Sequence, residues 1–134
     1  MVKENIRGYI FSRPFMGERV PQSVQSLLIR DYCSKNNLKF NLHAVEYTMP
    51  NCFLVFESCL NELDNFDGIV LYSLFQLPED NKQRNKYSDY ILSKKKKLHF
   101  ALENLKIDTE KSVVQIEEIW NIKKALPTCI TNII

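Results

Sequence analysis

The chain has little glycine, little net charge and no long apolar run. Its 134 residues include 3 glycines, so it holds neither a Walker loop nor a Gly-x-Gly-x-x-Gly loop, and nucleotide binding through either device is excluded. Apolar runs such as residues 69–72 are too short to span a bilayer. A formal net charge of +2 is too small to indicate nucleic acid or a membrane surface as a partner. We therefore expect no nucleic-acid partner and no membrane insertion.

Metal-binding and secretory patterns are also missing. The 4 cysteines form no Cys-x-x-Cys pair, and the 2 histidines lie far from them in sequence, so we expect reduced, buried thiols and no metal site. The first ten residues carry Lys3, Glu4 and Arg7 instead of an apolar signal segment, which argues against a secretory leader. No feature of the sequence calls for a cofactor, and we expect none.

The chain does contain short apolar runs typical of strands, and these alternate along the sequence with segments whose apolar residues recur at helical spacing. Hydrophobic residues make up 45% of it, enough for one domain, which we place at residues 1–127 before a short apolar tail at residues 128–134. Strands are predicted near residues 5–12, 38–47, 68–73 and 98–102, with helices near residues 21–35, 50–65, 78–97 and 108–127. Pro127 is expected to end the last helix. This order predicts a single-domain, three-layer α/β fold with a four-stranded, mainly parallel sheet.

In such sheets ligands bind beyond the carboxyl ends of the strands, where several polar residues are expected. The candidates are Ser12, Arg13, Arg19 and Gln22 after the first strand, Glu46 after the second, Ser73 and Gln76 after the third, and Glu103 after the fourth. Two arginines, a hydroxyl and a helix N-terminus can hold a phosphate or carboxylate, and Gly17 would permit a tight turn there. The alternative is that the arginines only pair with Glu18, Glu46 or Glu103.

Candidates for proton transfer also fall near these strand ends. His99 lies inside the fourth predicted strand, where it is either a satisfied core histidine or a general base. Glu46 and Glu103 form an acid–base pair if they converge, and otherwise pair with arginines at the rim. We take His99 and Glu103 as the candidate catalytic pair for a step without a cofactor. The lysine run at residues 94–97 suits the C-terminal end of a helix better than a nucleic-acid patch.

Two segments resemble the catalytic domain of serine recombinases of the resolvase/invertase type. Residues 7–12 (RGYIFS), with the helix that follows, resemble that family's opening strand and first helix, and residues 67–77 (DGIVLYSLFQL) resemble its central strand. The resemblance implies a resolvase-like version of the predicted fold, and flavodoxin-like topology is the related alternative.

The residues that carry recombinase chemistry are replaced. Aligned on Gly8, the family's serine nucleophile falls on Arg13 and the arginine two positions before it on Phe11. The family's Asp-Arg pair falls on Phe75-Gln76, and its next arginine falls on Glu79. Strand cleavage needs the serine and the arginines around the scissile phosphate, so we expect the fold without the recombination reaction.

A second resemblance spans nearly the whole chain. Segments 7–15 (RGYIFSRPF), 17–22 (GERVPQ), 72–78 (YSLFQLP) and 98–103 (LHFALE) are similar to small bacterial proteins called sporadic carbohydrate cluster proteins. That family is associated with gene clusters for surface polysaccharide or lipopolysaccharide synthesis. The resemblance implies a cytoplasmic role in making or modifying a sugar, and it supplies no reaction.

Together these observations predict a protein of bacterial surface-glycan biosynthesis that binds an anionic sugar or sugar nucleotide. The expected ligand-binding residues are Ser12, Arg13, Arg19, Gln22, Glu46, Ser73 and Gln76. Whether a cofactor-independent sugar modification occurs stays open. The alternative is a non-catalytic scaffold or regulatory subunit of a glycan-biosynthesis enzyme, with Phe15, Met16, Phe75 and the tail as its contact face. A homodimer is the commonest assembly for such domains.

Overall fold

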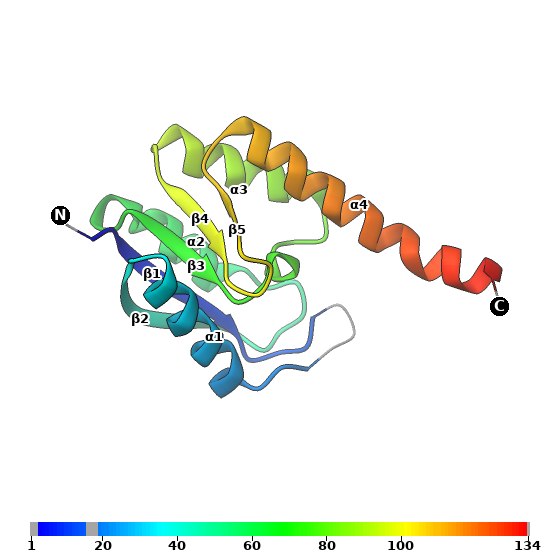
Figure 1. The fold of residues 1–134 in the computed structure, drawn as a ribbon, viewed down its shortest axis with the longest axis horizontal. Coiled ribbons are helices and arrows are strands. Elements are labelled where there is room, and N and C mark those ends of the chain that lie inside the picture. The colour runs from blue at the N-terminus through cyan, green and yellow to red at the C-terminus, as the bar shows by residue number, and fades with distance from the viewer. Residues whose placement is uncertain (1–2, 16–18, 134) are drawn as a thin grey trace.

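The computed structural model describes residues 3–15 and 19–133, and beyond residue 124 it describes the backbone alone. The strands are β1 (Asn5–Phe11), β2 (Lys39–Glu46), β3 (Gly68–Leu71), β4 (Lys97–Phe100) and β5 (Leu105–Ile107). The helices are α1 (Gln22–Lys35), α2 (Leu54–Asn61), α3 (Asn81–Ser93) and α4 (Glu110–Ile133), with the short 3-10 turns η1 (Leu63–Asn65) and η2 (Leu74–Gln76) (Figure 1).

The sheet confirms the predicted mainly parallel α/β fold with one strand more than expected. Its order is β2-β1-β3-β4-β5, and every neighbouring pair is parallel except β4 and β5. The unpredicted β5 has 3 residues and follows a turn in which Asn104 has φ 55°. A strand this short shows no period of its own, so the sequence pattern could not reveal it.

Helices cover both faces of the sheet, which gives the three expected layers. On one face, Phe56 of α2, Tyr87 of α3 and Trp120 of α4 share a core with side chains of the sheet. On the other face, Ile29 and Tyr32 of α1 pack in a second, smaller core. Since α1 is the one described helix on that face, it covers less of the sheet than the three opposite helices (Figure 1).

Three helix boundaries differ from the sequence-based prediction. The second helix begins at Leu54 rather than near Pro50, because the backbone of Asn51 is left-handed (φ 58°). The third begins at Asn81, where the Asp80 side chain accepts the amide of Lys82 and caps the helix.

The fourth helix, α4, is the third difference, because it runs past Pro127 to Ile133. A proline removes one helical hydrogen bond without necessarily ending a helix. The C-terminal part of α4 extends away from the rest of the fold (Figure 1). None of the helices in the described part of the chain combines the length and apolar character needed to cross a lipid bilayer.

Gly68, the first residue of β3, lies close to the backbone of the neighbouring strand β4. A Cβ added there would lie 2.4 Å from the carbonyl oxygen of Lys97, which is paired with Gly68 across β3 and β4. We therefore expect Gly68→Ala to lower the free energy of unfolding by about 1–3 kcal/mol, because the two strands must separate. Urea denaturation checks this, with Ser58→Ala on the exposed surface of α2 as control. A Gly68→Ala protein as stable as the control would contradict this account.

Candidate functional site

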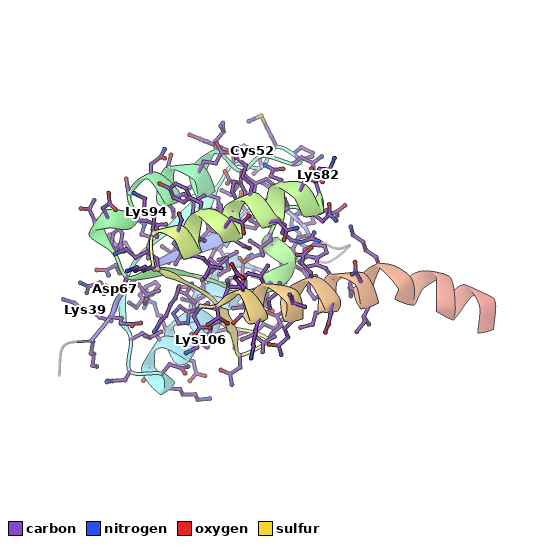
Figure 2. All side chains as sticks on the ribbon, turned by 90° about the horizontal axis from the view of Figure 1, so that it is seen from above. Lys39, Cys52, Asp67, Lys82, Lys94 and Lys106 are labelled. Carbon is purple, nitrogen blue, oxygen red and sulfur yellow. The ribbon has the colours of Figure 1, made fainter. Side chains whose placement is uncertain are left out.

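The carboxyl ends of β1 and β2 and the turn before α3 surround a pocket of about 250 Å³. It is lined by Phe11, Arg13, Pro14, Phe15, Thr48, Pro50, Asn51, Phe53, Phe75, Leu77 and Glu79. We call this the carboxyl-edge pocket. Cys52 and Lys82 lie toward this end of the molecule, and Lys39 and Asp67, where strands begin, lie toward the other (Figure 2).

Arg13 is the cation of the carboxyl-edge pocket. Its guanidinium carbon lies 4.1 Å from the ring centre of Phe11 and 5.1 Å from that of Phe53, and Nη1 donates to the carbonyl oxygen of Tyr47 at 2.9 Å. Its Nε and Nη2 groups bond no other described residue. Stacking on two rings and one hydrogen bond therefore hold the guanidinium in place and leave donors for an anion.

The described lining of the carboxyl-edge pocket combines aromatic rings with one arginine. Among the described lining residues there is no serine, cysteine, histidine or lysine, and the one hydroxyl belongs to Thr48. A nucleophile with an adjacent base is therefore missing from this part of the chain. Aromatic rings and one arginine are groups that stack on a planar ligand and bind its anionic part.

Glu46 does not face the carboxyl-edge pocket but holds its wall together. The side chain is 1% exposed and accepts the phenol of Tyr9 at 2.8 Å and the amides of Val55 and Phe56, both at 3.1 Å. Burial, followed by the charge of Glu46, raises the pKa of Tyr9, so the phenol keeps its proton and donates it. Glu46 therefore binds the first-turn amides of α2 from outside the helix, where the N-cap residue Phe53 makes no side-chain bond, and this position favours a carboxylate.

Gln76 is likewise buried, and it pairs with a residue that the sequence analysis missed. Its Nε2 donates to Oε1 of Gln25 at 2.8 Å, while its own Oε1 accepts the amide of Tyr72 at 3.0 Å. Gln25 also bonds both the amide and the carbonyl of Phe11, each at 2.9 Å. The signal that could have found Gln25 is its position on the buried side of α1, four residues before Ile29. Hydrogen bonds of the Gln25–Gln76 pair therefore link the carboxyl ends of β1 and β3.

Ser73 and Glu103 meet, as their positions at two strand ends predict. The Ser73 hydroxyl donates to Oε2 of Glu103 at 2.7 Å, and the amide of Leu74 donates to Oε1 at 3.0 Å. Glu103 lines a smaller cavity that also includes Lys123 and shares Phe15 and Phe75 with the carboxyl-edge pocket. This carboxylate therefore fixes the turn η2 beside the carboxyl-edge pocket.

The remaining candidates lie on or near the segment between β1 and α1. Ser12 donates its hydroxyl to the carbonyl oxygen of Glu46 at 2.9 Å. Arg19 is exposed and has no bond to another described residue, and Gln22 is the exposed first residue of α1. Gly17, like Glu18 and Met16, lies outside the described residues. Of the two arginines, the structure places Arg13 at the pocket.

His99 lies apart from Glu103. It projects from β4 toward α1, where Nδ1 is 2.7 Å from the phenol oxygen of Tyr32. It lines a different cavity, together with Lys97 at the start of β4. Burial and then the charge of Lys106 lower the pKa of His99 to about 4, so the imidazole is neutral at pH 7. The structure does not bring the two proposed proton-transfer residues into one pocket.

The fold and the arrangement of its strand ends define a resolvase-like α/β domain. It is similar to a crystal structure described as the N-terminal catalytic domain of TP901-1 integrase, with a TM-score of 0.61 and 14% identity. The match covers 95% of this chain and 98% of that one, and at this identity it establishes the fold. A scan against protein-family models and a search of curated proteins give no match.

The comparison corrects two sequence-based expectations. The matched structure belongs to an integrase, and nothing in the comparisons points to glycan biosynthesis or to a sugar ligand. The expected glycan-biosynthesis role is therefore wrong, both as a sugar-binding protein and as a scaffold of a glycan enzyme. The expected absence of a nucleic-acid partner is contradicted by the same match, which is to the catalytic domain of an integrase. The resemblance to sporadic carbohydrate cluster proteins finds no support beyond the sequence segments.

Proposed function

We propose that this chain is a non-cleaving, recombinase-like domain that binds single-stranded nucleic acid at the carboxyl-edge pocket. One observation carries the proposal. Four positions that fall on recombinase catalytic residues line this one pocket: Arg13 on the nucleophile, Phe11 and Glu79 on two arginines, and Phe75 on the aspartate of the Asp-Arg pair. The resemblance implies that phosphate chemistry occurs at these positions in recombinases. In this chain the same positions line a pocket, but the reactive side chains are replaced.

The replacements favour stacking and phosphate binding over strand cleavage. The rings of Phe53 and Phe75 line the pocket and are partly exposed, and a base stacks on such rings whatever its identity. Arg13 adds a fixed guanidinium with donors for a phosphate oxygen. A pocket of about 250 Å³ is at the small end for ligand sites, which suits one base better than a duplex.

The test is binding of a fluorescently labelled oligothymidylate by anisotropy at several salt concentrations. We expect a Kd of about 10⁻⁴–10⁻⁶ M for the unmodified protein at physiological salt. Arg13→Ala should weaken binding about tenfold and reduce the steepness of the log–log salt plot by about 0.7, the contribution of one phosphate contact to a single strand. Emission of Trp120 gives a second readout, since its ring centre is 5.0 Å from that of Phe75.

The matched control is Arg30→Ala. Arg30 is exposed on α1, lies over the Phe40 ring and is not among the residues that line the carboxyl-edge pocket, so the same charge is lost at a different place. Absence of binding, or an equal loss in both variants, would show that this pocket is not a nucleic-acid site. Nicking of supercoiled plasmid by the purified protein would refute the non-cleaving role.

A further inference from the structure

Another cavity lies at the amino ends of β1 and β4, away from the carboxyl-edge pocket. Its volume is about 320 Å³, and its walls include His99, Tyr32 and Lys97. It opens beside α1, on the face of the sheet that one described helix covers. We call it the His99 cavity.

His99 presents a buried donor without an acceptor. The residue is 3% exposed, and its Nε2 has no hydrogen-bond partner among the described residues. Burial raises the pKa of Tyr32 to about 12, so the phenol keeps its proton, and its oxygen is hydrogen-bonded to Nδ1 of His99, 2.7 Å away. In the tautomer in which the phenol donates to Nδ1, the proton of the neutral imidazole lies on Nε2, and this is the form that an anion would select. A buried N–H without an acceptor is costly, and such groups call for a missing partner.

The charge around His99 is positive. Lys106 is paired with His99 across β4 and β5, so the two side chains lie on the same face of the sheet, and Lys97 follows the same alternation. With Lys3, three lysines line the His99 cavity. Two carboxylates face them, because Oε1 of Glu4 lies 3.0 Å from Nζ of Lys97 and Oδ2 of Asp108 lies 3.7 Å from Nζ of Lys106. One positive charge is therefore left in excess.

The nearby end of α1 does not cancel this charge. Its last carbonyl groups are already bonded: the Asn36 side chain donates to the carbonyl of Tyr32, and the amide of Leu38 donates to that of Cys33. Capped carbonyls offer little attraction to a cation. The His99 cavity therefore combines an orphaned N–H donor with ammonium groups, the donor set of an anion site.

We propose that the His99 cavity binds an anionic oxygen group, the phosphate or the carboxylate of a small molecule. The oxygen accepts the Nε2–H of His99 and pairs with the ammonium groups of Lys106 and Lys97. The proposal is independent of nucleic-acid binding at the carboxyl-edge pocket, because the two sites share no lining residue.

The 2 histidines of the chain allow a test in which each serves as the reference for the other. NMR follows the imidazole signals of His99 and His43 with pH while inorganic phosphate or, in a separate arm, acetate is added at constant ionic strength with chloride. An anion in the His99 cavity opposes the field of the Lys106 and Lys97 ammonium groups and adds to that of Glu4 and Asp108. The pKa of His99 should therefore rise from about 4 by one unit or more, while the signals of His43, in β2, stay unchanged.

Variants separate a bound ion from a general salt effect. Lys106→Gln should weaken binding of the effective anion about tenfold. Lys82→Gln removes the same charge from α3, well apart from Lys106 in Figure 2, and should leave binding unchanged. Lys106 is exposed, so this variant should fold even where a change at the buried His99 does not.

A response to phosphate alone assigns the site to phosphate groups, and a response to acetate alone assigns it to carboxylates. Unchanged His99 signals with both anions would overturn the proposal. Equal weakening by Lys106→Gln and Lys82→Gln would also overturn it, because the anion would then bind diffusely. Binding of oligothymidylate at the carboxyl-edge pocket changes neither result, so the two proposals fail separately.

Discussion

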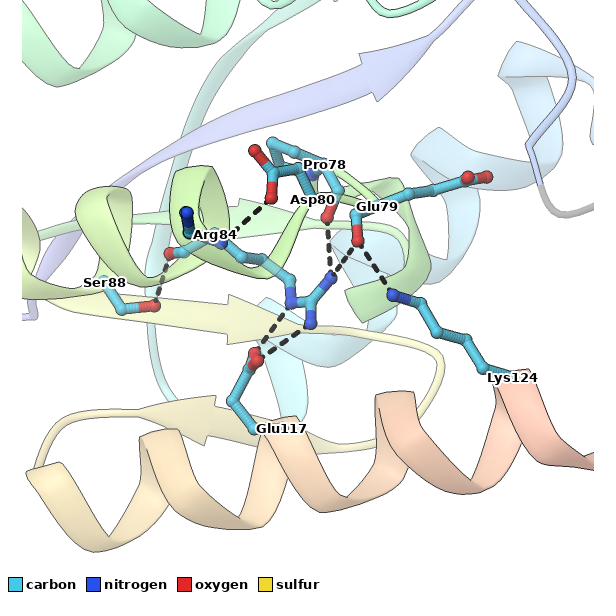
Figure 3. A network of polar contacts seen from close by, with 8 residues as sticks. Pro78, Glu79, Asp80, Arg84, Ser88, Glu117 and Lys124 are labelled. Carbon is cyan, nitrogen blue, oxygen red and sulfur yellow. Dashed lines mark hydrogen bonds and ion pairs between the residues drawn. The ribbon is translucent and has the colours of Figure 1, made fainter.

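Replacing Arg84 by alanine is expected to lower the free energy of unfolding by about 3–5 kcal/mol. Arg84 is 1% exposed, and its Nε and Nη2 donate to the two carboxylate oxygens of Glu117 at 2.7 and 2.8 Å (Figure 3). Its Nη1 donates to the carbonyl oxygens of Pro78 and Glu79, each at 2.9 Å, and its guanidinium lies over the Trp120 ring. Truncation leaves a partly buried carboxylate and the carbonyl of Pro78 without their donor, while the carbonyl of Glu79 keeps Lys124.

Urea denaturation followed by circular dichroism measures this loss without relying on Trp120, whose emission the variant would alter directly. Lys86→Ala on the exposed side of the same helix is the control and should change stability by less than about 0.5 kcal/mol. Arg84→Met retains most of the buried stem and should lose less than Arg84→Ala. A loss below about 1 kcal/mol in Arg84→Ala would show that the contacts with Glu117 and the two carbonyls contribute little.

The Arg84 network also explains how α4 supports the carboxyl-edge pocket. Arg84 joins α3 to Glu117 of α4 and holds the two carbonyls of the segment between η2 and α3. That segment places Leu77 and Glu79 in the wall of the pocket, and Lys124 of α4 donates to the carbonyl of Glu79 at 3.1 Å. The pocket is therefore built on rigid elements, which favours binding of a ligand in one defined position.

Most of the fold could be predicted from the sequence because its central elements have clear periods. The continuous apolar run that begins at Gly68 predicts a strand covered on both faces, and all four residues of β3 are buried. The sequence did not reveal β5 or the true end of α4, because the first is too short to show a period and the second passes through a proline. Local preference is a weak guide where tertiary packing decides.

The candidate site was predicted in position and much less in role. Arg13 and Glu103 lie at the carboxyl edge because parallel strands end together. Which donor each acceptor binds depends on contacts between distant segments. Glu46 is hydrogen-bonded to backbone amides of α2, and Gln76 is hydrogen-bonded to Gln25 and to the end of β3. No sequence spacing specifies these partners.

The error about function has a physical cause as well. The segments that resemble sporadic carbohydrate cluster proteins lie at strand ends, and strand ends form binding sites in many unrelated α/β proteins. They could therefore place a site but could not determine its ligand. The chemistry of Arg13 and of the four phenylalanines that line the pocket with it is the better guide, because it limits what the pocket can hold.

Replacing Glu46 by glutamine is expected to lower the free energy of unfolding by about 2–4 kcal/mol although the side chain keeps its size. The carboxylate accepts the amides of Val55 and Phe56, the amide of Tyr47 at 3.0 Å and the phenol of Tyr9. The backbone amides can only donate, so the NH₂ of glutamine would face the N–H of Phe56 at one oxygen position, or those of Tyr47 and Val55 at the other, and leave them unpaired. The N-terminus of α2 also loses its negative cap.

The expected loss is measured by urea denaturation against Glu62→Gln, the same change at the exposed end of α2. Tyr9→Phe should cost about 1 kcal/mol by itself and clearly less in the Glu46→Gln background, because the bond that it removes is already weakened there. Equal costs in both backgrounds would mean that Tyr9 and Glu46 are not coupled. Since Glu46 holds the segment that carries Thr48 and Asn51 into the carboxyl-edge pocket, Glu46→Gln should also weaken oligothymidylate binding, whereas Glu62→Gln should not.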